Sequence, residues 1–348
     1  MIIGDYSSLG LLIADNTNIK AQLNKLSEQV STGHVADSYG GLGAAAQVSL
    51  DLRPQLNHLA TEQGVIGAAT ARLGVTQSAL SQLASITSSF AAQTVNLNGV
   101  DANAVDSVAA AARTALQQVA VLLDSTDGGL YLFAGTDSSN PPVPGPDQIL
   151  ASGFYGKINA AVAGLSPTGD NSAAVTAGTL ALAQSNAVGT TPFSATLGPA
   201  ATVQVGGQLV QVGLLANANT LAVSVGGSTT GSYARDLLRS LATLGSLSSA
   251  QLHDPGFQAV VADTRASLQG AVTALADETG ALGDVQANLL ARATEAQATS
   301  LALTKQVSAV EDVDMAKALT QLSQAQLQLQ ASYKIIATAK NLSLVQYL

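Results

Sequence analysis

The sequence predicts a mainly α-helical protein with a β-rich insert, built as a long antiparallel helical rod with coiled-coil helices at both chain ends. Two patterns support this prediction. Apolar residues recur at spacings of three and four near both ends, whereas the middle of the chain alternates apolar and polar residues among Gly, Ser and Thr. With 348 residues, 47% of them hydrophobic, the chain is long enough for two or three domains with cores of their own.

The first predicted helix carries an apolar stripe. Ile19, Leu23, Leu26 and Val30 follow spacings of four, three and four residues, and Leu12 lies one heptad before Ile19. Such a stripe either pairs with another helix or faces an ordinary globular core, and one helix alone leaves both interpretations open.

A matching stripe lies at the other end of the chain. Its members alternate spacings of four and three around Gln326, and they are Met315, Leu319, Leu322, Leu329, Tyr333 and Ile336. Two such stripes with few flanking charges favour surfaces that pair within the chain and with neighbouring subunits. We therefore predict that the two stripes together form a subunit-assembly seam.

A long helix is predicted between about Arg53 and Val95, where apolar residues continue the same periodicity. Gly64, Gly67 and Gly74 lie inside this helix. Each costs about 1 kcal/mol relative to Ala, so we expect close packing against another helix to offset them.

The next segments mark the end of the outgoing helices. A helix is predicted over 102–123 and is ended by Asp127-Gly128-Gly129, and a short strand follows at Leu130–Phe133. The four prolines within 138–146 then forbid regular structure. We place a domain boundary at this loop.

The middle of the chain is predicted to be β-rich. A hairpin is expected from Thr202–Val205 and Gln208–Val212 around Gly206-Gly207, and the alternation of Leu221, Val223 and Val225 predicts another strand.

Helices are predicted to resume after the insert, from Tyr233 onwards. Asp254-Pro255 resembles an N-cap and first-turn proline that open a long helix towards Val307. The outgoing and returning helices predict three domains: a terminal coiled-coil domain of 1–36 plus 311–348, a helical rod of 37–140 plus 232–310, and an inserted β-rich outer domain of 141–231.

Composition argues against several function classes. The chain has 14 basic and 23 acidic residues, a formal charge of -9 and no Lys/Arg cluster, so we expect no nucleic-acid partner. The absence of Cys excludes disulfides and thiolate metal sites. No apolar run approaches the roughly 18 residues of a membrane span, and no Lys or Arg precedes Lys20 to form a secretory signal. The chain is therefore expected to be cytoplasmic or exported by a dedicated machine, without a membrane partner.

The polar residues predict no catalytic, cofactor or metal site. His34, His58 and His253 are far apart and none has a second ligand at a metal-binding spacing. No strand precedes Gly41-Leu42-Gly43, so this segment favours a flexible hinge over a dinucleotide loop. No nucleophile and base occur in a recognisable arrangement, and we do not expect an enzyme.

The acidic group of Glu311, Asp312 and Asp314 could form either a cation site or the cap of a helix. Its spacing does not match a calcium loop. Its position before Met315 favours a helix junction, where carboxylates accept hydrogen bonds from the first backbone N–H groups of a helix.

Both ends of the chain resemble known proteins. The segment Leu26–Gly33, reading LSEQVSTG, resembles the N-terminal signature of bacterial flagellins and flagellar hook-associated proteins, although HVADSYGGLGA follows it where that family often has a basic residue and a Pro-Ser-Asp-Asp-Pro-like run. Asp312–Ala316, Leu327–Ser332 and Leu342–Leu348 are similar to the C-terminal end of the hook-filament junction proteins, and so is 129–142, reading GLYLFAGTDSSNPP.

This resemblance implies a flagellin-like fold and a structural role in an extracellular bacterial flagellum. It implies an adaptor at the hook-filament junction that forms a homo-oligomer through its terminal helices, with another hook-associated protein on the hook side and flagellin on the filament side. It also implies type III export without a cleaved signal peptide and a cytoplasmic chaperone for the C-terminal helix. The alternative is a flagellin that forms the filament itself.

Overall fold

The computed structural model divides the chain into two compact units, Met1–Thr61 with Glu295–Leu348, and Glu62–Thr294. The predicted three-domain division is not decided by these units and stays a prediction. The residues that the structure describes are 3–97, 101–194, 201–205, 207–211, 214 and 228–342.

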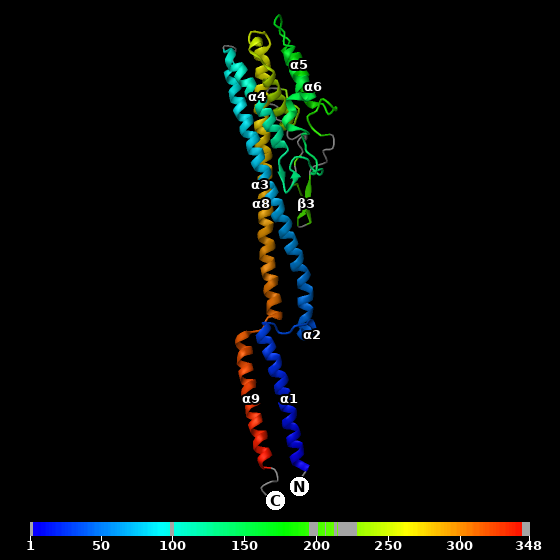
Figure 1. Ribbon diagram of the computed structural model, residues 1–348, viewed down its shortest axis with the longest axis vertical. Helices are drawn as coiled ribbons and strands as arrows, with labels where there is room; N and C mark the ends of the chain where they lie inside the picture. The colour runs from blue at the N-terminus through cyan, green and yellow to red at the C-terminus, as the bar shows by residue number, and fades with distance from the viewer. Residues whose placement is uncertain are drawn as a thin grey trace. The chain divides into compact units, whose positions relative to one another are not determined.

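The described part of the chain is mainly helical, as the sequence predicts, and its sheets are two small antiparallel pairs, β1-β2 and β3-β4 (Figure 1). In chain order the elements are α1 (Ile3–Thr32), α2 (Tyr39–Leu42), η1 (Gly43–Ala45), α3 (Ala46–Gln93), η2 (Thr94–Asn96), α4 (Ala102–Leu123), β1 (Thr126–Asp127), β2 (Leu130–Tyr131), η3 (Pro146–Ala151), α5 (Gly153–Ala163), α6 (Ser172–Gln184), β3 (Thr202–Val205), β4 (Gln208–Gln211), α7 (Tyr233–Ser246), η4 (Ser249–Gln251), α8 (Phe257–Glu311) and α9 (Met315–Leu342).

The predicted helix boundaries hold most closely where a side chain caps the helix. α4 spans the predicted 102–123, because the Asp101 carboxylate accepts a hydrogen bond from the backbone N–H of Asn103 at 2.9 Å. α8 begins at Phe257 rather than at Pro255, because a turn in which the Phe257 N–H donates to the Asp254 carbonyl precedes it. α3 begins at Ala46, well before the predicted start.

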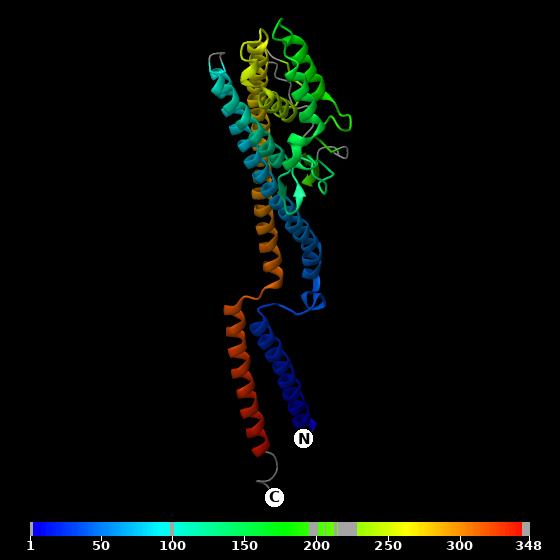
Figure 2. The ribbon, with the colours of Figure 1, turned by 45° about the horizontal axis from the view of Figure 1, so that its top comes forward.

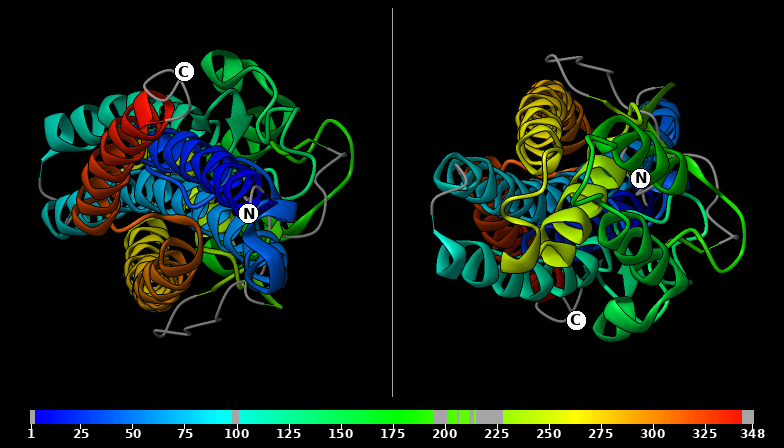
Figure 3. Two further views of the ribbon diagram at one scale, coloured as in Figure 1. Left: turned by 90° about the horizontal axis from the view of Figure 1, so that it is seen from below. Right: turned by 90° about the horizontal axis from the view of Figure 1, so that it is seen from above.

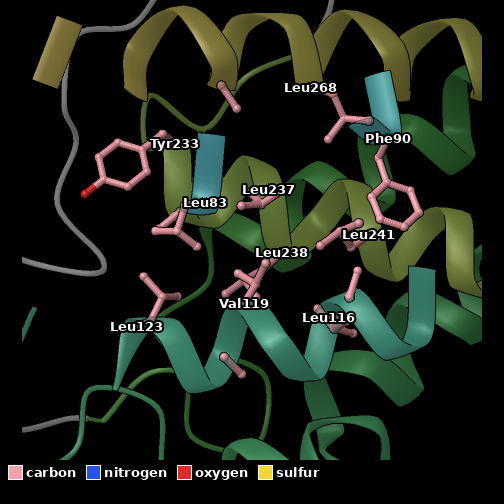
Figure 4. Close-up of a cluster of buried hydrophobic side chains, with 14 of the residues drawn as sticks. Leu83, Phe90, Leu116, Val119, Leu123, Tyr233, Leu237, Leu238, Leu241 and Leu268 are labelled. Carbon is pink, nitrogen blue, oxygen red and sulfur yellow. The ribbon is translucent and has the colours of Figure 1, made fainter. Parts of the chain in front are cut away.

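The core of the Glu62–Thr294 unit surrounds α7. All residues of α7 are buried, and the helix packs against α4, α5 and α6. Figure 4 shows leucines of α7 reaching Leu116, Val119 and Leu123 of α4 on one side and Phe90 of α3 and Leu268 of α8 on the other. A helix that is covered on every side must bury its polar residues too, so its charges need partners inside the unit.

Arg239 of α7, which is only 2% exposed, has its partners in a closed ring of polar contacts. Its Nη1 lies 3.2 Å from Asp263 Oδ2, and its Nη2 donates to the Ser228 carbonyl at 2.8 Å. The Ser228 N–H in turn donates to Asp263 Oδ1 at 3.1 Å. The ring fastens the chain just before it enters α7.

The insert contains more helix than its composition predicts. α5 and α6 occupy stretches of 141–231 that we expected to be β-rich, because alanines within them supply helix propensity. The predicted hairpin is present as β3 paired with β4, and Gly207 there has a φ of 78°. The predicted strand at Leu221, Val223 and Val225 lies outside the described residues.

The segment after α4 begins as a short strand but continues as core. β2 pairs with β1, and the predicted strand residues Leu132 and Phe133 follow it, both 0% exposed. The Leu132 N–H donates to the Ser125 carbonyl at 2.9 Å, and the Leu132 carbonyl accepts from the Leu214 N–H at 3.2 Å. The insert is thus joined to the helices through buried backbone.

The close packing predicted at the α3 glycines is absent among the described residues. A Cβ added at Gly64, Gly67 or Gly74 would meet no atom within 4 Å. The glycines lie on the exposed side of α3, where every third or fourth residue is Gly, Ala or Ser. These positions are Gly64, Gly67, Ala71, Gly74, Ser78, Ser81, Ser85, Ser88 and Ala92.

Gly153, at the start of α5, is required by a close backbone approach. A Cβ there would lie 2.2 Å from the Gly189 carbonyl oxygen, whereas a Cβ at Gly156 in the same helix would meet nothing within 4 Å. We expect Gly153→Ala to lower the free energy of unfolding by about 1–3 kcal/mol through overpacking. Gly156→Ala should raise it by about 1 kcal/mol through helix propensity. Thermal unfolding followed by circular dichroism measures both, and equal stability of the two variants would contradict this packing.

Asp124, which follows the last residue of α4, should make stability depend on pH. Burial raises the pKa of its carboxyl from 3.8 to about 6, although Oδ1 accepts a hydrogen bond from the Val143 N–H at 2.8 Å. Because the folded-state pKa is the higher one, this group's contribution to stability is complete below pH 3.8 and is lost as the pH rises through 6.

Asp124→Asn keeps the acceptor and removes the charge. Since the side chain is half-exposed and screened by solvent, we expect a gain of only about 1 kcal/mol above pH 7. Below pH 4 the gain should vanish. Urea unfolding at both pH values measures it, and a gain that is the same at both would exclude Asp124 titration as the cause.

Candidate assembly surface

The terminal unit is built around an antiparallel pair of helices, α1 and α9, which lie side by side in Figures 1 and 2 and in the left view of Figure 3. Two backbone hydrogen bonds join the segment that follows α1 to the stretch between the end of α8 and the start of α9. The Val313 N–H donates to the Gly33 carbonyl at 2.9 Å, and the Val35 N–H donates to the Glu311 carbonyl at 2.7 Å. Both helices then run from this junction towards the chain ends.

α1 ends at Thr32, and the chain turns at Gly33, the last residue of the LSEQVSTG segment. Gly33 has a φ of 76°, a conformation that favours glycine, and its N–H still donates to the Gln29 carbonyl at 2.9 Å. The Gln29 side chain donates to the Val35 carbonyl at 2.8 Å. The turn therefore sends the chain across the start of α9 with its backbone groups paired.

Three carboxylates fix the junction, each with a different partner. Arg53 Nη2 lies 2.6 Å from Glu311 Oε2, and the hydrogen bonds from Arg53 and then from Ser49 lower the pKa of Glu311. His34 Nδ1 lies 3.2 Å from Asp312 Oδ1. Asp314 Oδ1 accepts from the Lys317 N–H at 3.1 Å, so the predicted capping of α9 is confirmed for Asp314.

The junction also contains an open hollow of about 470 Å³, lined by residues that include His34, Asp37, Tyr39, Arg53 and Glu311. Within the described ranges, no three His, Asp or Glu side chains are grouped to hold a metal ion. Of the charged groups that line the hollow, Arg53 and Glu311 pair with each other, and His34 pairs with Asp312 beside it. Their evident effect is to hold the loop after α1 against the end of α8.

The contact surface of α1 and α9 is a series of layers. One of these layers is polar: Asn16 Nδ2 of α1 donates to Ser332 Oγ of α9 at 3.0 Å. Because the helices are antiparallel, the next layers are reached by moving three or four residues forward along α1 and the same number back along α9. The resulting pairs are Ile19 with Leu329, Leu23 with Ala325, Leu26 with Leu322 and Val30 with Ala318. All of these residues are buried or half-buried, so the layers form a continuous seam.

The predicted stripe residues fall into two groups in the structure. Those at the contact between the helices are Ile19, Leu23, Leu26, Val30, Leu322, Leu329 and Ile336. By contrast, Met315, Leu319 and Tyr333 are 42%, 50% and 47% exposed on α9. Leu12 belongs to α1, but its side chain lies outside the described part. The role of all these residues in subunit assembly stays a prediction.

The small and polar half of the seam is not marked by large apolar residues. Asn16, Ala318, Ala325 and Ser332 are 2–8% exposed, and none is large or apolar enough to mark a stripe by itself. A signal was nevertheless present: Ala318, Ala325 and Ser332 recur at intervals of seven, each four residues before Leu322, Leu329 or Ile336. Small residues four positions before a large apolar residue therefore mark this face in the sequence.

Comparison with protein families assigns both ends of the chain. Residues 12–138 match the bacterial flagellin N-terminal helical region, and residues 266–348 match the bacterial flagellin C-terminal helical region. No curated protein matches the chain. Among the described helices, none has both the length and the hydropathy to cross a lipid bilayer. The two matched regions contain the α1–α9 seam apart from its outermost turns, and the chain therefore belongs to the bacterial flagellin family.

Proposed function

We propose that this chain is the adaptor at the junction between the flagellar hook and the filament. As a member of the flagellin family it is a structural, exported component of the bacterial flagellum that polymerises through its terminal helices. The proposal adds its place in the flagellum. It rests on the segment 129–142, which resembles the hook-filament junction proteins, together with the similar ending at Leu342–Leu348.

The position of 129–142 supports this proposal. The segment begins at the end of the β1-β2 turn, and Leu132, Phe133 and Ala134 within it are all 0% exposed. It connects α4 to the insert, so its sequence is constrained by the core at the point where the insert begins. Surface loops vary more freely among related proteins, so the buried residues Leu132–Ala134 constrain this segment more than its exposed ones do.

The second candidate is a flagellin that forms the filament itself. The observation that favours it is the pair of matched regions, because both belong to bacterial flagellins. The two candidates differ in stoichiometry. A filament protein forms long fibres from many copies, whereas an adaptor stops at a short assembly between two other proteins.

As an adaptor, the chain has four classes of partner. Copies of itself pair through the terminal helices, another hook-associated protein contacts the assembly on the hook side, and flagellin contacts it on the filament side. A cytoplasmic chaperone covers the C-terminal helix before type III export without a cleaved signal peptide.

Deletion of the gene distinguishes the two candidates. If the chain is the adaptor, hooks still form and flagellin is still exported, but flagellin lacks a surface on which to polymerise. We expect bare hooks in electron micrographs and abundant monomeric flagellin in the culture supernatant. Expression of the intact gene from a plasmid should restore filaments.

Two other outcomes would reject the adaptor. Filaments of normal assembly in the deletion strain would show that the junction does not need this chain. Loss of the secreted flagellin together with the filaments would identify the chain as the filament protein.

A further inference from the structure

We infer that the buried pair Asn16–Ser332 is a specificity-determining layer, which selects the face of α9 that pairs with α1. The two side chains are 7% and 8% exposed, and Asn16 Nδ2 donates to Ser332 Oγ at 3.0 Å across an otherwise apolar seam. This inference concerns pairing within one chain and does not depend on the place of the protein in the flagellum.

α9 offers α1 two faces that share one row of side chains. The shared row is Leu322, Leu329 and Ile336. On one flank of it lie Ala318, Ala325 and Ser332, and on the other lie Leu319, Gln326 and Tyr333. Each flank continues the shared row at spacings of three and four, so each completes a coiled-coil stripe.

Apolar burial alone does not explain the observed choice. The flank that faces α1 consists of two alanines and a serine, whereas Leu319 and Tyr333 of the other flank remain 50% and 47% exposed. Burial of a large side chain is more favourable than burial of Ala. Close approach of the two helices along the small flank offsets part of this difference, but another contribution is needed to make the choice unique.

The polar layer supplies that contribution. In the observed pairing the Asn16 amide meets the Ser332 hydroxyl, which is close to the α9 backbone. If α1 turned to the other flank in the same register, Asn16 would face the ring of Tyr333, whose hydroxyl lies at the far end of the side chain. A buried amide without a partner is costly, so that pairing is disfavoured.

Asn16 fits a selecting role better than a purely stabilising one. Its Oδ1 is buried and has no hydrogen-bond partner among the described residues, so the layer lowers the stability of the seam relative to an apolar pair. A single polar residue at a core position of a coiled coil fixes pairing at a cost in stability. The choice of the face of α9 that meets α1 also determines which apolar side chains stay exposed on this protein, which polymerises. These side chains are Met315, Leu319 and Tyr333.

Cysteine cross-linking tests the selection in the full-length chain. The natural sequence has no cysteine, so introduced thiols are the only ones present. Leu23→Cys combined with Ala325→Cys reports the observed face, and Leu23→Cys combined with Gln326→Cys reports the other face. The rates of intrachain disulfide formation are compared in dilute solution, with products identified by mass spectrometry.

In the parent background the 23–325 pair should cross-link faster than the 23–326 pair. Asn16→Leu should raise the rate ratio of 23–326 to 23–325 by about tenfold, the effect of one hydrogen-bond partner lost or gained in a buried site. Asn18→Leu, the same change at an exposed position of α1, should leave the ratio unchanged. Exchange of the pair, Asn16→Ser with Ser332→Asn, should restore the parent ratio.

Two results would overturn the inference. An unchanged ratio in Asn16→Leu would mean that the remaining seam selects the face. Loss of both cross-links in Asn16→Leu, with the helix content retained by circular dichroism, would mean that the polar layer holds the helices together rather than choosing between faces. Neither result bears on the junction proposal, which the deletion strain tests separately.

Discussion

Arg239→Met should lower the free energy of unfolding of the Glu62–Thr294 unit by about 3–5 kcal/mol, because it leaves the Asp263 carboxylate, whose side chain is only 16% exposed, without its cation. Arg239 is 2% exposed and joins α7 to Asp263 of α8 and to the Ser228 carbonyl. Methionine fills a similar volume, so the loss reflects the charge and hydrogen bonds. Urea unfolding followed by the helical circular dichroism signal measures the change.

A matched substitution at an exposed arginine distinguishes the effect of losing the buried ring from the effect of replacing any arginine by methionine. Arg292 Nη2 donates to Gln208 Oε1 at 2.5 Å at the surface of the same unit, and Arg292→Met should cost at most about 1 kcal/mol. The double variant Arg239→Met with Asp263→Asn should be more stable than Arg239→Met alone, because the amide oxygen still accepts from Ser228 and carries no charge. Equal stability of Arg239→Met and Arg292→Met would contradict the ring.

Leu329→Asp should abolish polymerisation and leave the Glu62–Thr294 unit folded. Leu329 lies opposite Ile19 in the α1–α9 seam, so a carboxylate there would be inserted among apolar side chains. Burying an unpaired charge costs several kcal/mol, which exceeds what a single layer contributes. Hydrogen exchange should show loss of protection in α1 and α9, and sedimentation should show no polymer.

Leu327→Asp and Leu209→Asp provide controls of the same chemistry at exposed positions. Leu327 is 63% exposed on α9, so its variant should keep the α1–α9 amides protected. Leu209 in β4 is 74% exposed, so its variant should leave both the hairpin and polymerisation intact. Normal polymerisation of Leu329→Asp would reject the seam as the assembly element.

The helices were predictable from the sequence where the signals were local. The apolar period of 102–123 predicted α4 correctly, and the Gly33 turn and the Asp314 cap are contained in a few neighbouring residues. The helices α5 and α6 were missed because a Gly- and Thr-rich composition was averaged over the whole insert. Their own alanine content would have indicated helix over a shorter window.

Only the large apolar residues of the candidate assembly surface were predictable, because its small and polar residues and its ion pairs depend on which faces of the helices meet. Ile19, Leu23, Leu26, Leu322 and Leu329 were found because large apolar residues reveal a coiled-coil period. The ion pairs Arg53–Glu311 and His34–Asp312 join residues that are far apart in the chain, and no local spacing predicts them.

By itself, the sequence determined the mainly helical class, the two terminal stripes, the turn that ends α1 and the resemblance to flagellar proteins. Each of these depends on residues within a few turns of one another, where helix geometry relates spacing to position. Only the tertiary structure decided which flank of α9 meets α1, that α7 is buried with Arg239 paired to Asp263, and that the α3 glycines face outward. These outcomes depend on competition between helix surfaces that are distant in the chain. Where apolar periodicity leaves two pairings of helix faces nearly equal in free energy, a few polar contacts such as Asn16–Ser332 can decide between them.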